Sequence, residues 1–339
     1  MSVVSSTDIV MLRTTHRKGW PMTVADSRDS ARQTSQQATG KRGWSWYRLS
    51  EGLTPYLLIA PLLILITIFI FWPLIYSFYL SFFDWNFVRP NKTYVGLDNF
   101  TRLPDEPRFM RAVKGTLFYT AVLVPLQVFL PLGLALLLWP IRKSKAQTSY
   151  RIMLFSPTII AYSVAAVMWL WIFNPLQGIL NKVLAEFGYE RISWLSDRDT
   201  AIWSIIIVAT WKTLGFHMLL YLAALEGVPK DYIEAASLDG ANHWQLMRSI
   251  RFPLITPTFF FVLVTTVISV NDDVFGAINV LTNGGPFDST TNIIYYLYQQ
   301  GFQYFQIGAA SAVAIIVFLA TSLLTWIQFR FVERHVHYG

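Results

Sequence analysis

The sequence contains no cysteine, and only 14% of its residues are charged. The absence of cysteine excludes disulfides, thiol nucleophiles and cysteine-ligated metals, and the five histidines lack the spacing of a metal site. No G-x-x-x-x-G-K-[ST] pattern occurs, because Gly40-Lys41 lacks both the upstream glycine and the following hydroxyl residue. Neither G-x-S-x-G nor H-E-x-x-H is present. The chain therefore has no P-loop of its own for ATP, and an enzymatic function has no support.

Apolar residues are abundant instead. The 339 residues are 54% hydrophobic and include 25 Phe, 16 Tyr and 13 Trp. A helix needs about 20 apolar residues to cross about 30 Å of hydrocarbon, and six segments meet or approach that length. We therefore expect an all-α polytopic membrane protein with six transmembrane helices, at about 54–83, 116–139, 151–173, 201–225, 254–280 and 307–329.

The N-terminal region differs from the rest of the chain. Residues 1–45 are rich in Ser, Thr, Gln and Arg and contain no apolar core of signal-peptide length. This composition is typical of disorder. We expect residues 1–45 to form a disordered cytoplasmic tail and residues 46–339 to form one transmembrane domain.

The formal net charge of +7 would suggest nucleic-acid binding in a soluble protein, but here the basic residues flank apolar spans. With the N-terminus inside, seventeen Lys and Arg fall on the cytoplasmic side and nine on the opposite side. Cytoplasmic loops carry the excess of Lys and Arg. The count predicts that both termini are cytoplasmic, and it places the connection between the fourth and fifth spans, residues 229–253, in the cytoplasm.

This connection is a polar stretch with helix signals. Pro229 suits a first helical position, and Gly240 suits a left-handed cap that ends the first helix. Asn242 and Gln245 have the spacing of a capping pair, which predicts a second helix from His243 to about residue 250. Pro253 is expected to stop that second helix. The stretch is therefore predicted to be a helix-turn-helix between two spans.

The same stretch resembles the EAA loop of ABC importer permeases. The resemblance is carried by Glu234, Ala235, Ala236, Asp239, Gly240, Ile250 and Pro253, with Phe252 where the family pattern usually has Leu. In that family the loop is a coupling helix that sits in a cleft of the ATP-hydrolysing subunit. On residues alone, an ordinary capped loop is the alternative.

Three further segments resemble carbohydrate-type ABC importer permeases of the MalF-like kind. They are 94–100 (YVGLDNF), 281–291 (LTNGGPFDSTT) and 308–312 (GAASA), so the resemblance covers about residues 50–330. It implies a type I ABC importer permease in a prokaryotic inner membrane, importing a sugar, an oligosaccharide or a glycerol phosphate. It also implies a second permease, an ATPase dimer that binds ATP and Mg²⁺, and an extracytoplasmic solute-binding protein as partners, with no cofactor in this chain.

Charged residues lie inside two of the expected spans. Lys212, Asp272 and Asp273 would each cost about 2.5–3.5 kcal/mol in contact with lipid at mid-bilayer, so they must face protein or water. One interpretation is a solute pathway in which they act together with Phe216, Asn271, Phe275 and Asn279. The alternative is that Lys212 pairs with one of the aspartates and ties two helices together.

A different class of protein, an ion- or proton-coupled secondary transporter, would also carry charges within its spans. Such a protein is expected to show internal repeats and broken helices at corresponding places. No convincing repeat is present, and this alternative leaves the EAA-like loop unexplained. The transported solute cannot be read from the sequence.

Overall fold

The computed structural model describes residues 46–140 and 144–331, so the expected tail, residues 1–45, lies outside the described residues. The chain divides into two units, Met1–Thr67 and Ile68–Gly339. The first unit contains α2 (Trp46–Ile66), whose sequence is apolar and includes Pro55 and Pro61. A π-helical turn, Thr67–Phe71, follows it.

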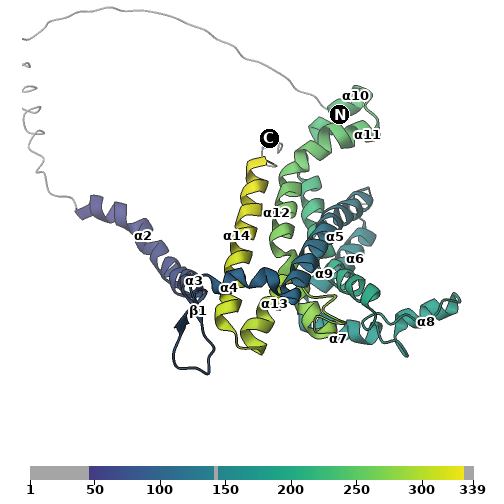
Figure 1. Cartoon of the computed structure of the whole chain (residues 1–339). Coiled ribbons are helices and arrows are strands. Elements are labelled where there is room, and N and C mark those ends of the chain that lie inside the picture. The colour runs from purple at the N-terminus through teal and green to yellow at the C-terminus, as the bar shows by residue number, and fades with distance from the viewer. Residues whose placement is uncertain (1–45, 141–143, 332–339) are drawn as a thin grey trace, which may run out of the picture. The chain divides into compact units, whose positions relative to one another are not determined.

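The second unit is almost entirely helical (Figure 1). A short hairpin pairs β1 with β2 in antiparallel register, Phe83 opposite Tyr94. The elements are α3 (Trp72–Leu80), β1 (Phe83–Asp84), β2 (Thr93–Tyr94), α4 (Asp98–Thr101), α5 (Pro107–Leu138), α6 (Lys145–Ile159), α7 (Tyr162–Ile172), α8 (Ile179–Glu186), α9 (Arg198–Glu226), α10 (Lys230–Leu238), α11 (His243–Leu246), α12 (Phe252–Ala277), α13 (Ile293–Tyr298) and α14 (Ile307–Phe331).

The expected all-α membrane architecture is confirmed. Five helices are long and apolar enough to span a membrane: Pro55–Leu80, Pro107–Leu138, Arg198–Glu226, His243–Thr282 and Ile307–Arg330. The pair α6 and α7 makes a sixth if it counts as one broken span. Every expected apolar segment therefore corresponds to a helix or a helix pair.

The third expected span, 151–173, corresponds to two helices, α6 and α7, rather than to one continuous helix. The axes of α6 and α7 differ by 106° across a two-residue break. Ile160 and Ala161 have extended backbones, with ψ of 136° and 144°, and such residues cannot continue the helical hydrogen-bond ladder. Pro157 lies in the last turn before the break. Because proline has no backbone N–H, it weakens the helix there.

The core lies where α5, α9 and α12 pack against one another (Figure 1). One apolar cluster joins these helices to α7 and includes Tyr119, Ile205 and Val274. A second cluster lies toward the other end of the same helices and includes Tyr221 and Ile255. The bundle places α10 and α11 at one end and α7, α8 and α13 at the other (Figure 1).

A glycine lets α9 approach α6. A Cβ atom added at Gly215 would lie 2.0 Å from the carbonyl oxygen of Leu154 and 2.6 Å from the Cα of Phe155. These are backbone atoms, so no side-chain rotation could relieve the overlap. The close contact keeps the end of α6 beside α9, where the functional residues described below lie.

We predict that Gly215→Ala lowers the free energy of unfolding by about 1–3 kcal/mol, because the new methyl group forces the two helices apart. Thermal unfolding of the purified transporter would measure the loss. Gly133→Ala is the matched control, because a Cβ atom there meets nothing within 4 Å. Equal melting temperatures for the two variants would contradict the tight contact.

Candidate functional site

The connection between α9 and α12 forms two short helices whose caps match the sequence pattern. Gly240 has φ of 81°, and Ala241 N–H donates to the Ala236 carbonyl at 2.9 Å while Gly240 N–H donates to Ser237 at 3.1 Å. This pair of bonds is a Schellman cap. Asn242 and Gln245 exchange hydrogen bonds of 2.9 and 2.8 Å, which completes a capping box. The predicted helix-turn-helix is confirmed.

Two details of that prediction were wrong. Pro229 is the residue before the helix, not its first residue, because its ψ of 135° is not helical. Pro253 does not stop the second helix. Residues Met247–Arg251 form a π-helical turn in which Phe252 N–H donates to the Met247 carbonyl, and the chain runs on into α12 as one helix, His243–Thr282. Proline at the start of α12 needs no N–H partner, so the turn accommodates it.

A groove runs between α10 and the start of α12. It has a volume of about 440 Å³ and is lined by Tyr232, Ala235, Ala236, Asp239, Ser249, Ile250, Pro253 and Leu254. Five of the seven residues expected to couple to an ATPase therefore lie on one surface. Glu234 and Gly240 are exposed beside the groove but do not line it.

The two short helices leave much of their apolar surface exposed, although Ile233 of α10 packs on an apolar cluster and Leu246 of α11 is buried. None of the residues of α10 is buried. Leu238 is 89% exposed and Trp244 is 70% exposed, although both are large apolar side chains. An exposed apolar surface of this kind next to a groove of small residues is typical of an interaction site.

Lys212 lies at the break between α6 and α7. It is only 6% exposed, and its Nζ donates to the carbonyl oxygen of Thr158 at 3.0 Å. Thr158 Oγ1 in turn donates to the Lys212 carbonyl at 3.1 Å. The last carbonyl groups of a helix lack intrahelical partners and carry partial negative charge, which an ammonium group satisfies. Lys212 therefore caps α6.

Tyr162 completes this cluster, and the sequence analysis missed it. The Nζ of Lys212 lies 4.9 Å from the centre of the Tyr162 ring, and a Cβ atom at Gly276 would lie 3.0 Å from the Cβ of Tyr162. Tyr162 is the first residue of α7, so the position of its side chain depends on the break between α6 and α7. Pro157 inside an expected span was the available signal for that break.

The aspartates of α12 are not ion-paired with Lys212. Within residues 55–140 and 144–330, no ion pair joins Lys212 to Asp272 or Asp273, so the direct contact of Lys212 is with a helix end. Asp273 accepts a hydrogen bond from Ser269 Oγ at 3.0 Å, and Asp272 is exposed. Asp273 nevertheless lies near enough to Lys212 for their opposite charges to attract each other.

Some of the other expected pathway residues contact neighbouring helices, and others are exposed or half-buried. Asn271 Nδ2 donates to Thr120 Oγ1 of α5 at 3.0 Å. Phe275 packs on Tyr298, with ring centres 5.3 Å apart. Phe216 is exposed on α9, and Asn279 is half-buried in the π-helical turn after α12. Thus Asn271 and Phe275 hold α12 to its neighbours, whereas Phe216 and Asp272 are exposed.

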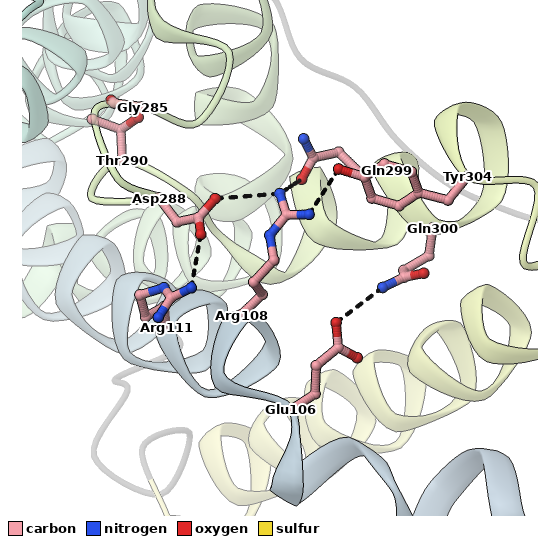
Figure 2. A network of polar contacts seen from close by, with 9 residues as sticks. All are labelled: Glu106, Arg108, Arg111, Gly285, Asp288, Thr290, Gln299, Gln300 and Tyr304. Carbon is pink, nitrogen blue, oxygen red and sulfur yellow. Dashed lines mark hydrogen bonds and ion pairs between the residues drawn. The ribbon is translucent and has the colours of Figure 1, made fainter.

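A polar network fixes the turn after α12 at the end of the bundle opposite α10 (Figure 2). Asp288 accepts hydrogen bonds from Arg108 at 3.2 Å and from Arg111 at 2.9 Å. Arg108 also donates to Gln299 at 3.0 Å and to the hydroxyl oxygen of Tyr304 at 2.7 Å. The start of α5 is thereby joined to both sides of α13.

Further contacts reach the Gly-Gly-Pro turn, residues 284–286. Thr290 Oγ1 donates to the carbonyl oxygen of Gly285 at 2.8 Å, and its own carbonyl accepts from Tyr119 at 3.0 Å. Glu106 accepts hydrogen bonds from Tyr296 and Gln300. Burial and the bond to Glu106 raise the pKa of Tyr296 well above its usual range. This turn is therefore a fixed part of the fold.

Metal binding has little basis in the described part of the chain. No group of three or more His, Asp or Glu residues gathers there in a geometry that could hold a metal ion. The polar side chains of the cluster at Lys212 face helix ends and aromatic rings instead.

The sequence matches a known family over most of its length. The profile of the family described as "Binding-protein-dependent transport system inner membrane component" matches residues 106–338. The chain is 37% identical over 291 residues to the sn-glycerol-3-phosphate transport system permease protein UgpA of Brucella abortus, covering 85% of this chain and 97% of that protein. It is 36% identical to the UgpA protein of Agrobacterium fabrum over the same shares of both chains.

Solved structures share the fold. A chain of a bacterial alginate ABC transporter, solved in complex with an alginate pentasaccharide-bound periplasmic protein, superposes with a TM-score of 0.77 at 24% identity. The match covers 87% of this chain and 99% of that chain. A second structure of an alginate importer gives a TM-score of 0.75 at 24% identity, covering 85% and 98%. The helical arrangement described above is thus a known one.

We predict that Lys212→Met exposes the end of α6 to fraying, because the Thr158 carbonyl loses its donor. Amide hydrogen exchange of peptides spanning residues 156–164 should become about tenfold faster, in keeping with a lost hydrogen bond to a charged group. Lys182→Met, on the exposed side of α8, is the control and should leave these peptides unchanged. Unchanged exchange in Lys212→Met would show that Lys212 does not hold the break.

Proposed function

The chain belongs to the family of binding-protein-dependent transport system inner membrane components, and we propose that it couples to its ATPase through the groove beside α10. It is a permease subunit of an ABC importer and not an enzyme. The observation that carries the coupling proposal is the groove itself, because it joins small residues of α10 with the start of α12 on a surface that no described residue covers.

The groove suits a protein partner. Ala235 and Ala236 allow a second backbone to approach closely, and Asp239 adds a carboxylate at its edge. Glu234 offers a second carboxylate that is exposed to the partner. A partner side chain that fills a small-residue pocket and is fixed by charge at the rim is typical of stable interfaces.

The continuous helix would transmit movement of the coupling loop to the proposed pathway. Because α11 runs through the π-helical turn into α12, the helix His243–Thr282 is about 60 Å long at 1.5 Å per residue. A shift of the coupling loop therefore moves α12 as a rigid body. Asp272 and Asp273 lie on that helix beside the cluster at Lys212, so closure of the ATPase would change the pathway lining directly.

We place the solute pathway in the space around the break between α6 and α7. Tyr162 supplies an aromatic ring with a hydroxyl group, and Asp272 and Phe216 are exposed on the two neighbouring helices. Lys212 acts as a positioning residue, because its ammonium group is already bound to Thr158. Aromatic rings and hydrogen-bonding groups near the membrane middle suit a polar, hydroxylated solute.

We infer the class of solute from the names of the related proteins. Proteins 33–37% identical to this chain are named as permeases for sn-glycerol-3-phosphate. We propose a sugar, an oligosaccharide or a glycerol phosphate as the solute. The companions would be a second permease, an ATPase dimer that binds ATP and Mg²⁺, and an extracytoplasmic solute-binding protein, as in the alginate transporter solved with its periplasmic protein.

We infer the orientation of the chain in the membrane from the distribution of its Lys and Arg residues. The seventeen Lys and Arg on the α10 side against nine on the other support a prokaryotic inner-membrane protein with both termini and the coupling groove in the cytoplasm. The network around Asp288 would then face the solute-binding protein. This arrangement puts the groove where an ATPase can reach it.

We predict that Ala235→Leu fills the groove and lowers co-purification of the ATPase at least tenfold, because the partner loses its close approach. Pull-down of the complex followed by quantification of both chains would measure this. Ser149→Leu, on the exposed side of α6, makes the same change of size outside the groove and should retain the ATPase. Full retention in Ala235→Leu would exclude the groove as the docking surface.

We predict that Asp272→Ala lowers solute uptake at least fivefold without lowering assembly with the ATPase, because Asp272 is exposed to the pathway. Uptake by reconstituted vesicles and co-purification should be measured on the same preparation. Glu186→Ala in α8 removes an exposed carboxylate elsewhere and should transport normally. Normal uptake by Asp272→Ala would remove this residue from the pathway.

A further inference from the structure

A second groove lies between the starts of α5 and α9, at the end of these helices opposite the coupling loop. It has a volume of about 540 Å³ and is open to the surroundings. Its residues come from the first turns of two membrane-spanning helices and from the turn at Asp288. The groove therefore lies at one end of two helices that are long and apolar enough to span a membrane.

The rim of this groove is basic. Lys114 and Arg198 are exposed there, and neither forms an ion pair or a hydrogen bond with another side chain in the described part of the protein. The carboxylate of Asp288 is shared by Arg108 and Arg111, so it does not neutralise these two cations (Figure 2). Asp199 is the other acidic residue of the groove. The rim thus carries a net positive charge.

The deeper part of the groove is aromatic. Phe118 and Trp203 meet edge to face, with ring centres 5.7 Å apart. Phe118 is 37% exposed and Trp203 is 49% exposed. Phe118 lies one helical turn below Lys114, about 6 Å away along the axis. Tryptophan is enriched at the boundary between hydrocarbon and headgroups, which fits this depth.

An unpaired hydroxyl group lies at the wall of the groove. Ser289 lines the groove, and its Oγ atom is buried without a hydrogen-bond partner in the described structure. A buried polar atom of this kind normally has a partner. Rotation of the Ser289 side chain about χ1 would let the hydroxyl group donate to an anionic oxygen in the groove, near the cations of the rim.

The groove is separate from the solute pathway. Trp203 and Lys212 are nine residues apart on α9, which places them about 180° apart around the helix at 100° per residue. The Lys212 side of α9 faces the break between α6 and α7, so Trp203 faces away from it. A ligand in this groove would not be the transported solute.

We propose that this groove binds an anionic phospholipid, with the phosphate group at Lys114, Arg198 and Ser289 and an acyl chain against Phe118 and Trp203. The commitment to a lipid rests on the combination of a basic rim with an aromatic wall that continues down two membrane spans. A soluble anion would use the rim alone. The lipid would stabilise the start of α5, to which the network at Asp288 is anchored.

The test uses the assembled transporter in detergent and native mass spectrometry with phosphatidylglycerol or phosphatidylcholine of the same chain length. We expect phosphatidylglycerol to bind preferentially. The double variant Lys114→Gln/Arg198→Gln should weaken that binding about 25-fold, since each cation near an anionic lipid contributes about fivefold. Lys182→Gln/Arg191→Gln removes the same charges from exposed positions outside the groove and should bind as wild type does.

Further arms separate the sources of the phosphate and the kinds of partner. The charge-conserving variant Lys114→Arg/Arg198→Lys should retain binding, which separates charge loss from misfolding. Trp203→Ala should weaken binding of long-chain but not of short-chain phosphatidylglycerol. Three results would each overturn the proposal. The first is equal binding of phosphatidylglycerol by the Gln double variant and wild type, and the second is displacement of the lipid by millimolar glycerol phosphate. The third is that the Gln double variant loses docking of the solute-binding protein while its lipid binding stays intact.

Discussion

The bond between the ammonium of Lys212 and the carbonyl of Thr158 is the contact on which the middle of the bundle depends. A helix broken inside a membrane leaves carbonyl groups that neither lipid nor water can satisfy, and each costs several kcal/mol. Lys212 supplies a donor from the neighbouring helix, and Gly215 one turn later lets the two backbones meet. Without both residues, a 106° bend at this depth would have no compensation.

The break in turn positions the candidate pathway. Tyr162 can face α9 and α12 because α7 starts in a new direction, and Gly276 leaves room for its ring. The charge of Lys212 is used within the fold, so it does not by itself indicate an anionic solute. Asp272 and Phe216, which are exposed, are the groups that the proposed pathway would offer to a solute.

Much of this arrangement could be predicted from the sequence because its signals are local. Apolar runs of membrane length gave all the spanning segments, and the spacing of Asn242 and Gln245 gave the capping box. The break and the passage through Pro253 could not be predicted, because both depend on contacts between segments. Pro157 and Pro253 look alike in sequence, yet one precedes a break that Lys212 caps, whereas the other begins a continuous helix.

The two ends of α12 are held differently, and this difference bears on how movement is transmitted. At one end the helix continues into α11 through a π-helical turn, and no residue of α10 is buried. At the other end Thr290, Tyr119 and the network at Asp288 fix the following turn to α5. A force applied at the proposed coupling groove would therefore turn α12 about the end that is fixed to α5. The displacement would be largest near the groove and smaller at Asp272 and Asp273, where a rotation would change which side chains face the proposed pathway.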